Sequence, residues 1–358
     1  MNMMLDAIKK IYSKLGDDQS RDIFLNRVLY SITEDNTYID NIVSVYYKRM
    51  QKEFCGGGYT DAISNLRQQI GNRKVVIYGK GNCGFVTLAL FTSAMKDIDV
   101  VAFCDRNTSG GVFYGYKLVD IDELARNYKD TVILVTPVVE RVKDEIISNL
   151  VKRGFNLDQI IEKVPFRDYV LRGEYFDEVM QFGEDEVFVD AGCFNCGTAI
   201  DFVERHSSYK KIISFEPDLE QYDLCLQISQ TQEIRNHTIY NMGLWDKKDE
   251  LYFMQAGSSG CLSQEGNIRV KVDTLDHILQ GEKVTFIKMD IEGAELRALH
   301  GCRNTIVEHR PKLAICVYHK PNDIIEIPLY IHEIAPEYKF YLRHHSKGRS
   351  ETVLYAVP

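Results

Sequence analysis

Short apolar runs of four or five residues alternate with longer amphipathic stretches through most of this 358-residue chain. Short apolar runs bounded by turn residues predict buried strands, and apolar residues recurring every three or four positions predict helices. Strands that alternate with helices predict parallel pairing through right-handed crossovers. The chain is therefore expected to have an α/β fold.

The predicted strands fall into two groups. The first group predicts a small Rossmann-like α/β module, with strands at 74–78, 100–104 and 131–135. The second predicts a seven-stranded Rossmann-like sheet, with strands at 187–190, 211–215, 236–240, 284–289, 313–318, 338–343 and 352–357. The last two strands are joined by a short loop and should form an antiparallel hairpin. An insert of strand-like pieces and polar loop separates the third and fourth.

Helical patterns account for most of the rest. The expected domains are a helical N-terminal region at 1–70, the small module at 71–164, a helical connector at 165–183 and the larger domain at 184–358. Three consecutive glycines at 56–58 end the second long helical pattern.

Composition excludes several classes of protein. No apolar run approaches the roughly 20 residues that span a bilayer, and the N-terminus lacks the apolar core of a signal peptide. A net charge of −9 argues against nonspecific binding to nucleic acid or anionic membranes. Nine scattered cysteines without a secretion signal suit reduced thiols. We expect a cytoplasmic protein without a nucleic-acid partner or membrane span.

The segment 186–198 carries the strongest chemical signal. An apolar strand ends at Asp190, a turn contains Gly192, and a helix begins near Gly197. The next strand ends at Glu216, 19 residues after Gly197. Glycines let the backbone approach a ligand closely, and the second carboxylate can accept hydrogen bonds from ribose hydroxyls. Because an Asp at the first strand end opposes pyrophosphate but suits a sulfonium ligand with an amino group, the pattern predicts S-adenosylmethionine binding and methyl transfer.

Neighbouring loops are expected to complete this cofactor site. Cys193 lies in the first loop, and Pro217 fixes the turn after the second strand. Met242 and Gly243 follow the third strand, where they could cup the adenine. The alternative for these two residues is a packed turn around Trp245, the only tryptophan.

Cys193 and Cys196 form a Cys-x-x-Cys pair inside the predicted ligand loop. A zinc ribbon would need a second such pair, and the sequence contains none. We favour small loop residues here over redox or metal chemistry.

A third group of polar residues lies between 286 and 295. A strand delivers Lys288 and Asp290 to the same side, because side chains two residues apart share a face. Glu292 follows in the turn, and Glu295 lies on the next helix. The acids could bind Mg²⁺, form a metal-free polar site or cap the helix. We favour the metal-free site and assign no metal ligands.

His319 follows Tyr318 at the end of the fifth strand. Methylating a hydroxyl requires removal of its proton, and histidine titrates near neutral pH. We expect His319 to be the catalytic base, with Lys288, Asp290 and Glu292 orienting the acceptor. The alternative is a structural histidine that is hydrogen-bonded at the strand end.

The small module carries a second candidate site. Gly79, Gly81 and Gly84 follow a strand and open a helix, and Asp105 ends the next strand 21 residues after Gly84. This spacing is a dinucleotide fingerprint, and Lys80 could meet a phosphate. Many α/β modules reuse such a turn, so we favour a structural or substrate-presenting role over a nucleotide or nucleotide-sugar site.

Together these motifs resemble the FkbM-type methyltransferases over about 184–358. The resemblance rests on the segments 187–192, 215–217, 272–276, 287–295 and 318–319. It implies a methyltransferase sheet, S-adenosylmethionine as the donor, and methylation of hydroxyls on natural products or sugars of surface polysaccharides. By position, the family's cofactor and acidic residues correspond to Asp190, Gly192, Glu216, Asp290, Glu292 and Gly293. One departure is Cys196, where the family usually has glycine.

The motifs and this resemblance together predict an O-methyltransferase that uses S-adenosyl-L-methionine. The resemblance implies a small-molecule or glycan acceptor in carbohydrate biosynthesis, either a sugar of a surface polysaccharide or nucleotide sugar, or a natural product. The alternative is an NAD-dependent sugar oxidoreductase or epimerase that uses the N-terminal module. The sequence does not identify the acceptor, and it leaves open whether a metal is needed and whether the chain forms a homodimer.

Overall fold

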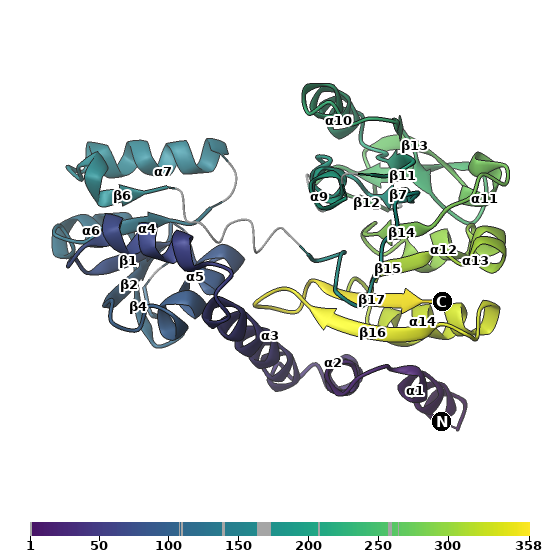
Figure 1. Cartoon of the computed structure of the whole chain (residues 1–358), viewed down its shortest axis with the longest axis horizontal. Coiled ribbons are helices and arrows are strands. Elements are labelled where there is room, and N and C mark those ends of the chain that lie inside the picture. Colours follow the sequence, from purple (N-terminus) through teal and green to yellow (C-terminus); the bar gives the residue numbers. More distant parts are fainter. Residues whose placement is uncertain are drawn as a thin grey trace. The chain divides into compact units, whose positions relative to one another are not determined.

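The structure is a computed structural model that describes residues 2–106, 108, 110–137, 140–162, 173–206, 208–256, 260–263 and 265–358. The chain divides into two compact units (Figure 1). The larger unit comprises Met1–Ile42, Glu174–His345 and Arg349–Pro358, and the smaller unit comprises Val43–Gly173 and Ser346–Gly348.

A seven-stranded sheet forms the centre of the larger unit, in the order β16-β17-β15-β14-β7-β8-β9. Its strands are β7 (Val187–Ala191), β8 (Lys211–Phe215), β9 (His237–Tyr240), β14 (Phe286–Met289), β15 (Lys312–Cys316), β16 (Lys339–His344) and β17 (Thr352–Val357). The first five are parallel, and β16 and β17 form the antiparallel hairpin. The predicted seven-stranded sheet is confirmed.

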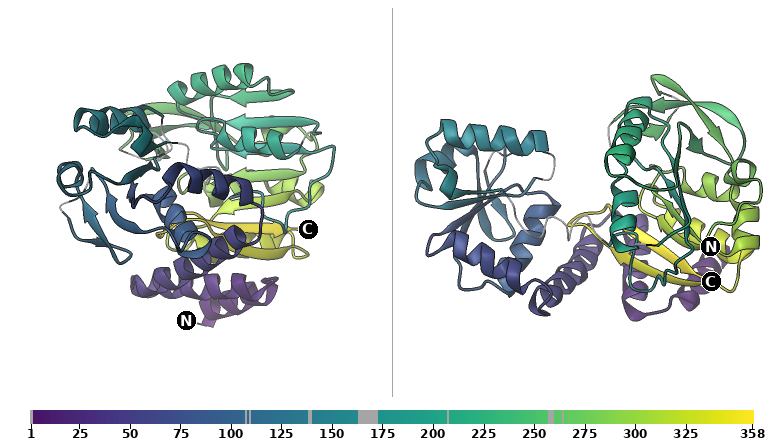
Figure 2. Two further views of the ribbon diagram at one scale, coloured as in Figure 1. Left: turned by 60° about the vertical axis from the view of Figure 1, so that its left-hand side comes forward. Right: turned by 45° about the horizontal axis from the view of Figure 1, so that its top comes forward.

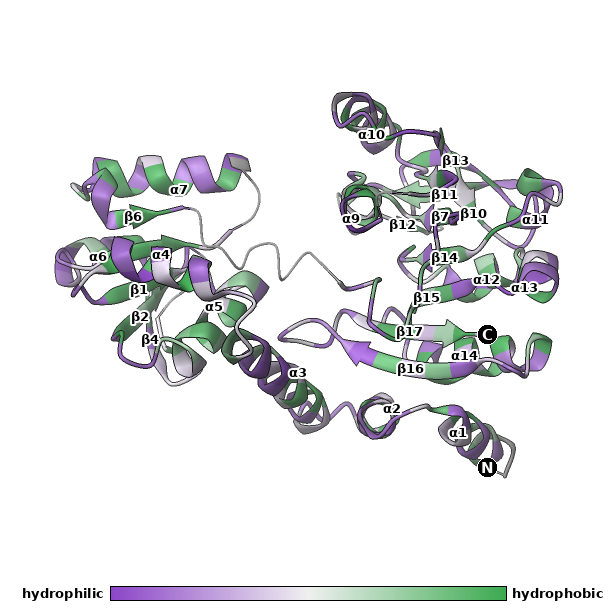
Figure 3. Ribbon diagram, in the orientation of Figure 1, coloured by the Kyte–Doolittle hydropathy of each residue, from purple (hydrophilic) through white to green (hydrophobic). Residues whose placement is uncertain are grey.

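Helices cover both faces of this sheet (Figures 1 and 2). The helices in the connections between its strands are α9 (Gly197–Arg205), α10 (Leu219–Thr231), α11 (Leu275–Leu279), α12 (Glu295–His300), α13 (Arg303–His309) and α14 (Asp323–Ile334). Phe188 and Phe286 stack on neighbouring strands with ring centroids 4.8 Å apart, and Phe202 of α9 packs 4.8 Å from Phe188. The hydrophobic residues of the strands therefore lie between helical layers (Figure 3).

The predicted insert is a separate four-stranded sheet in the order β10-β13-β11-β12. Its strands are β10 (Gly243–Leu244), β11 (Asp249–Met254), β12 (Cys261–Leu262) and β13 (Ile268–Asp273). Phe253, Val270 and Val272 form its small apolar core.

The predicted helical region 1–70 is divided between the two units. Helices α1 (Asn2–Lys14) and α2 (Asp18–Thr33) belong to the larger unit, α4 (Thr60–Ile70) to the smaller, and α3 (Thr37–Cys55) contains the boundary. The Gly16 N–H donates to the Phe340 carbonyl (2.8 Å), and the Leu342 N–H donates to Ser20 Oγ (2.9 Å). The first two helices are thus attached to the edge strand β16, which a helical pattern alone does not encode.

The connector predicted to be helical at 165–183 is not helical in the part that the structure describes. Residues 173–183 form bends and turns, and residues 165–172 lie outside the described residues. Tyr175, Phe176 and Met180 are buried in the hydrophobic core, so packing on the sheet overrides the apparent helical spacing.

The smaller unit contains a six-stranded sheet in the order β3-β4-β2-β1-β5-β6. Its strands are β1 (Val75–Tyr78), β2 (Val100–Cys104), β3 (Val112–Phe113), β4 (Tyr116–Val119), β5 (Val132–Val135) and β6 (Ile160–Ile161), and its further helices are α5 (Asn82–Ser93), α6 (Ile121–Asn127) and α7 (Glu140–Lys152). The three predicted strands are confirmed, whereas β3, β4 and β6 are too short to stand out in the sequence.

Within the described residues of both units, no helix has the length and apolarity to cross a bilayer.

Candidate active site

The predicted site residues meet at the carboxyl ends of four adjacent strands. In the order β15, β14, β7 and β8, these ends carry His319, Asp290, Asp190 and Glu216. Neighbouring strands lie about 4.8 Å apart, so four strand ends form one continuous row. The sheet therefore brings together groups that are up to 129 residues apart in sequence.

A buried ion pair lies in the centre of this row. Lys288 Nζ lies 3.0 Å from Asp190 Oδ1, and the two side chains are 3% and 0% exposed. The same ammonium donates to the carbonyls of Gly192 (2.7 Å) and Ala191 (3.2 Å). Burial alone would lower the pKa of Lys288, but the charges of Asp190 and Asp290 raise it, so the lysine is charged. The pair fixes the loop after β7.

This geometry changes the roles expected for both residues. Asp190 was predicted to face the amine or sulfonium of the cofactor, and Lys288 to orient the acceptor. In the structure each side chain contacts the other and is enclosed by protein. Their arrangement supports a positioning role, and direct ligand contact stays a prediction.

Gly192 is required by the packing of two loops. Its φ is +78°, and a Cβ built there would lie 2.0 Å from the backbone oxygen of Asp290. A side chain at this position would push apart the loops after β7 and β14. The glycine predicted for close approach of a ligand is therefore needed first for close approach of the protein backbone.

Glu216 is held by backbone groups on both sides. Its Oε2 accepts from the Phe194 N–H (2.9 Å), and its Oε1 accepts from the Asp218 N–H (2.9 Å). Burial raises its pKa to about 7, although these two hydrogen bonds act in the opposite direction. A carboxylate oxygen has two lone pairs, so each oxygen can still accept a hydroxyl. The residue suits the recognition of a ribose diol.

The other predicted cofactor residues surround Glu216. Met242 follows β9, and Gly243 begins β10. Pro217 lies in the turn after β8, where Asn241 Nδ2 donates to the carbonyls of Glu216 (3.0 Å) and Pro217 (3.2 Å). Asn241 was not predicted as a site residue, although it adjoins the residues that were.

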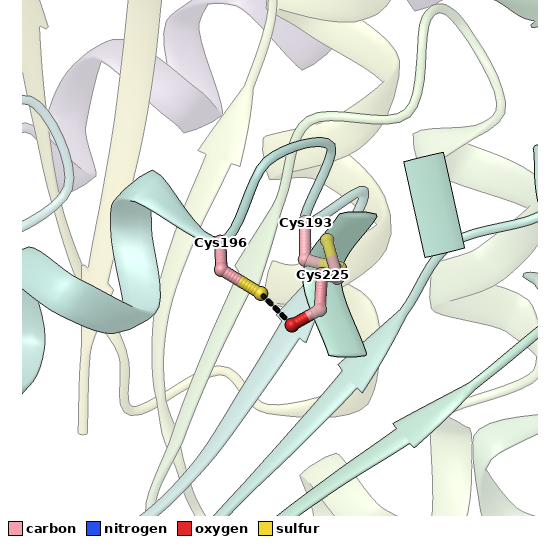
Figure 4. A group of neighbouring side chains, drawn as sticks. All are labelled: Cys193, Cys196 and Cys225. Carbon is pink, nitrogen blue, oxygen red and sulfur yellow. Dashed lines mark hydrogen bonds between the residues drawn. The ribbon is translucent and has the colours of Figure 1, made fainter. Parts of the chain in front are cut away.

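The first loop, between β7 and α9, contains Cys193 and leads to Gly197. Gly197 begins α9, and its N–H donates to Asn195 Oδ1 (3.1 Å). The Cys193 side chain is buried and lies beside Cys225 of α10 (Figure 4). Its contact with a cofactor stays a prediction.

The acids of the third group surround His319. Its Nε2 lies 3.4 Å from Asp290 Oδ1 and 3.4 Å from Glu292 Oε2, and its Nδ1 lies 3.0 Å from Glu295 Oε1. Burial alone would lower the pKa of His319, but the hydrogen bond and charge of Glu295, with the charges of Asp290 and Glu292, raise it to about 9. The imidazole is therefore protonated at neutral pH.

Two tyrosines complete this cluster. The Tyr175 hydroxyl donates to Asp290 Oδ2 (2.8 Å), and the Tyr318 hydroxyl donates to Asp290 Oδ1 (3.5 Å). Tyr175 was missed because it lies 115 residues before Asp290, in a segment with no local chemical signal. Lys288 Nζ also lies 5.2 Å from the centre of the Tyr175 ring.

Within the described residues, two groups of side chains have ligand atoms close enough together to hold a metal ion. They are Asp290, Glu292 and His319, and Cys193, Cys196 and Cys225, each set with its ligand atoms within 4.8 Å of one another. For the first group, the metal-free polar site stays a prediction.

The glycine turn of the smaller unit has the geometry of the predicted fingerprint. Gly79 has a φ of +116°, and a Cβ at Gly84 would lie 1.9 Å from the Gly79 oxygen, so both positions require glycine. Asp105 Oδ2 accepts from the Lys80 backbone N–H (2.9 Å). A Cβ built at Gly81 would have no atom of the described residues within 4 Å.

Comparison with known proteins finds similarity to methyltransferases. The family described as "Methyltransferase FkbM domain" matches residues 193–342. Among solved structures, the methyltransferase FkbM from Methylobacillus flagellatus KT is 21% identical, with a TM-score of 0.46, over 88% of this chain and 99% of its own. None of the curated proteins matches the sequence.

Two further solved structures are similar over about half of the chain. An rRNA methylase from Streptococcus thermophilus is 16% identical, with a TM-score of 0.33, over 53% of this chain and 90% of its own. Fibrillarin from Aeropyrum pernix, in complex with natively bound S-adenosyl-L-methionine, is 11% identical, with a TM-score of 0.30, over 49% of this chain and 66% of its own.

Proposed function

We propose that the chain is an S-adenosylmethionine-dependent methyltransferase of the FkbM type, because the model of that domain matches residues 193–342. It methylates a hydroxyl group at the carboxyl ends of β7, β8, β14 and β15. One observation carries this proposal: Glu216 and the cluster of Asp290, Glu292 and His319 share one sheet edge. Asp290 and Glu216 end strands two positions apart, a separation of roughly 10 Å.

The residues around β8 suit the donor. Glu216 accepts the ribose hydroxyls, while Met242 and Gly243 lie beside the adenine. The N-terminus of α9 favours the carboxylate of the donor, because helix N-termini carry partial positive charge. The bound sulfonium supplies a methyl group that is already activated, so holding the two reactants in line provides much of the rate.

The residues around β14 and β15 suit the acceptor. The side chains of Asp290 and Glu292 are 24% and 25% exposed, whereas His319 is 8% exposed. An acceptor hydroxyl therefore meets the carboxylates first. One of them takes its proton as the new carbon–oxygen bond forms and the sulfur–methyl bond of the donor breaks. The imidazolium of His319 lies behind them and holds their geometry. This assigns His319 a positioning role in place of the predicted role as base.

We further propose that the acceptor is a sugar or a natural product, with a nucleotide sugar as the leading candidate. The glycine turn of the smaller unit supports this choice, since Gly81 leaves room for a phosphate. A reducing compartment such as the cytoplasm suits the chain, because all nine cysteines are free thiols.

Binding of S-adenosylhomocysteine by isothermal titration tests the site. Glu216→Gln should weaken binding at least about tenfold, since it removes a charged acceptor from two hydroxyl donors. Glu220→Gln, the same change at an exposed position four residues away, is the matched control and should bind normally. Equal affinity in the two variants would remove Glu216 from the site.

Substrate class is tested separately. Purified chain, S-adenosylmethionine and a panel of nucleotide sugars should release S-adenosylhomocysteine with at least one acceptor, and the methylated product should gain one methyl mass. Stabilisation by NAD that is lost in Asp105→Ala, without methyl transfer, would favour the oxidoreductase alternative.

A further inference from the structure

Three cysteine thiols converge beside the proposed cofactor loop (Figure 4). Cys193 and Cys196 come from the loop after β7, and Cys225 comes from α10. The sulfurs of Cys193 and Cys225 are 3.6 Å apart, and all three sulfurs lie within 4.8 Å of one another. Each side chain is at most 2% exposed. The third thiol could not be found from spacing, because it lies 29 residues beyond the Cys-x-x-Cys pair.

We propose that Cys193, Cys196 and Cys225 bind a zinc ion, which joins the cofactor loop to α10. Thiolates bind zinc at about 2.3 Å in tetrahedral geometry, which separates two ligand sulfurs by about 3.8 Å. The observed 3.6 Å is close to that separation. It is much longer than the roughly 2.05 Å of a disulfide, and three convergent sulfurs exceed what one disulfide uses.

The backbone gives a second reason to assign a role to the sulfur of Cys196. Its φ is +57°, in the left-handed region that glycine adopts without strain. Phe194, two residues earlier, has a φ of +48°. A cysteine at such a position is explained if its side chain is needed, and here its sulfur points toward the Cys225 carbonyl at 3.7 Å (Figure 4).

Charge and ligand chemistry select the ion. Thiolate ligands favour zinc and monovalent copper over calcium or magnesium. Three thiolates with Zn²⁺ leave a single net negative charge in a buried site, whereas Cu⁺ would leave two, at a greater desolvation cost. Binding releases the thiol protons to solvent, and a water completes the fourth position, as in other zinc sites with three protein ligands.

The position of the site suggests what the metal does. Phe194 lies between the two loop cysteines, and its N–H donates to Glu216 Oε2 (2.9 Å). A zinc ion would hold this loop against α10 and so fix the carboxylate proposed to bind ribose. This effect on cofactor binding rests on the proposed function, whereas the metal site itself does not.

The test uses the full chain, purified under reducing conditions, loaded with Zn²⁺ and dialysed. We expect about one zinc per chain by mass spectrometry in the wild type, and about none in Cys196→Ala and Cys225→Ala. Cys302→Ala is the matched control, a fully buried cysteine elsewhere in the larger unit, and it should retain the metal. Loading with Co²⁺ should produce thiolate charge-transfer bands in the wild type, which decides the question even if a variant fails to fold.

Two results would overturn the zinc site. One is a folded wild type that keeps no more zinc than Cys225→Ala, without cobalt–thiolate bands. The other is a Cys193–Cys225 disulfide in the intact mass, which would make the cluster redox-active instead. If zinc binds but the loaded protein takes up no S-adenosylhomocysteine, the metal site stands and the proposed function fails. Removing zinc should weaken binding of that ligand at least several-fold if both are right.

Discussion

The protonated state of His319 predicts a specific loss of stability at alkaline pH. Its pKa rises from 6.5 to about 9 on folding, so the folded chain holds this proton more tightly than the unfolded chain. The resulting stability is fully present below pH 6.5 and is lost as the pH rises through 9. The side chain is only 8% exposed, so solvent screening reduces the effect little. Linkage between proton binding and folding predicts that the free energy of unfolding falls by roughly 2 kcal/mol between about pH 7.5 and 9.5.

Urea unfolding followed by fluorescence measures this loss. Trp245 is the only tryptophan and lies in the larger unit, so the signal reports unfolding of the unit that contains His319. Glu216 also titrates on folding, but its pKa of about 7 puts its effect below the chosen range. The wild type should lose about 2 kcal/mol more than His319→Gln between the two pH values.

An exposed histidine in the same unit provides the control. His300→Gln should keep the wild-type dependence on pH, because His300 is on the surface of α12. The reasoning is refuted if His319→Gln and the wild type lose stability in parallel. That result would mean that His319 is neutral near pH 7.5, and it would restore this residue as a candidate base.

Three other substitutions test the same arrangement. Lys288→Met leaves the Asp190 carboxylate buried without its partner and should cost about 3–5 kcal/mol in urea unfolding; a loss below about 1 kcal/mol would show that the pair is not buried. Gly192→Ala places a Cβ against the Asp290 backbone oxygen, at a residue whose φ is +78°. It should lower the free energy of unfolding by at least about 1–3 kcal/mol. An unchanged melting temperature would contradict the close approach of the two loops. Tyr175→Phe removes a hydrogen bond to Asp290. It should raise the activation free energy by about 1–2 kcal/mol, and so lower kcat, with little change in the Kd for S-adenosylhomocysteine. Equal effects on kcat and Kd would argue against an acceptor-side role for Tyr175.

The sequence was sufficient to predict the sheet that carries the site. Long buried strands such as β7 and β14 have continuous apolar runs, and Asp190, Glu216 and Asp290 follow or end them at positions that any parallel sheet brings to one edge. Short strands such as β3 and β6 have two residues each and leave no such signal.

Roles within the site were harder to predict than positions. Asp190 and Lys288 pair because β7 and β14 are neighbours with these residues in register, a fact of strand order and not of spacing. The pKa of His319 depends on three acids that surround it in space, one of them on α12. Tyr175 and Cys225 join their clusters from distant segments, so long-range packing alone identifies them.

The most direct test of the central claim is a crystal structure of the full chain with S-adenosylhomocysteine. The ligand should lie at the carboxyl ends of β7 and β8, with its ribose hydroxyls bonded to the Glu216 carboxylate and its sulfur facing Asp290 and Glu292. Ligand density at the glycine turn 79–84, with none beside Glu216, would contradict it.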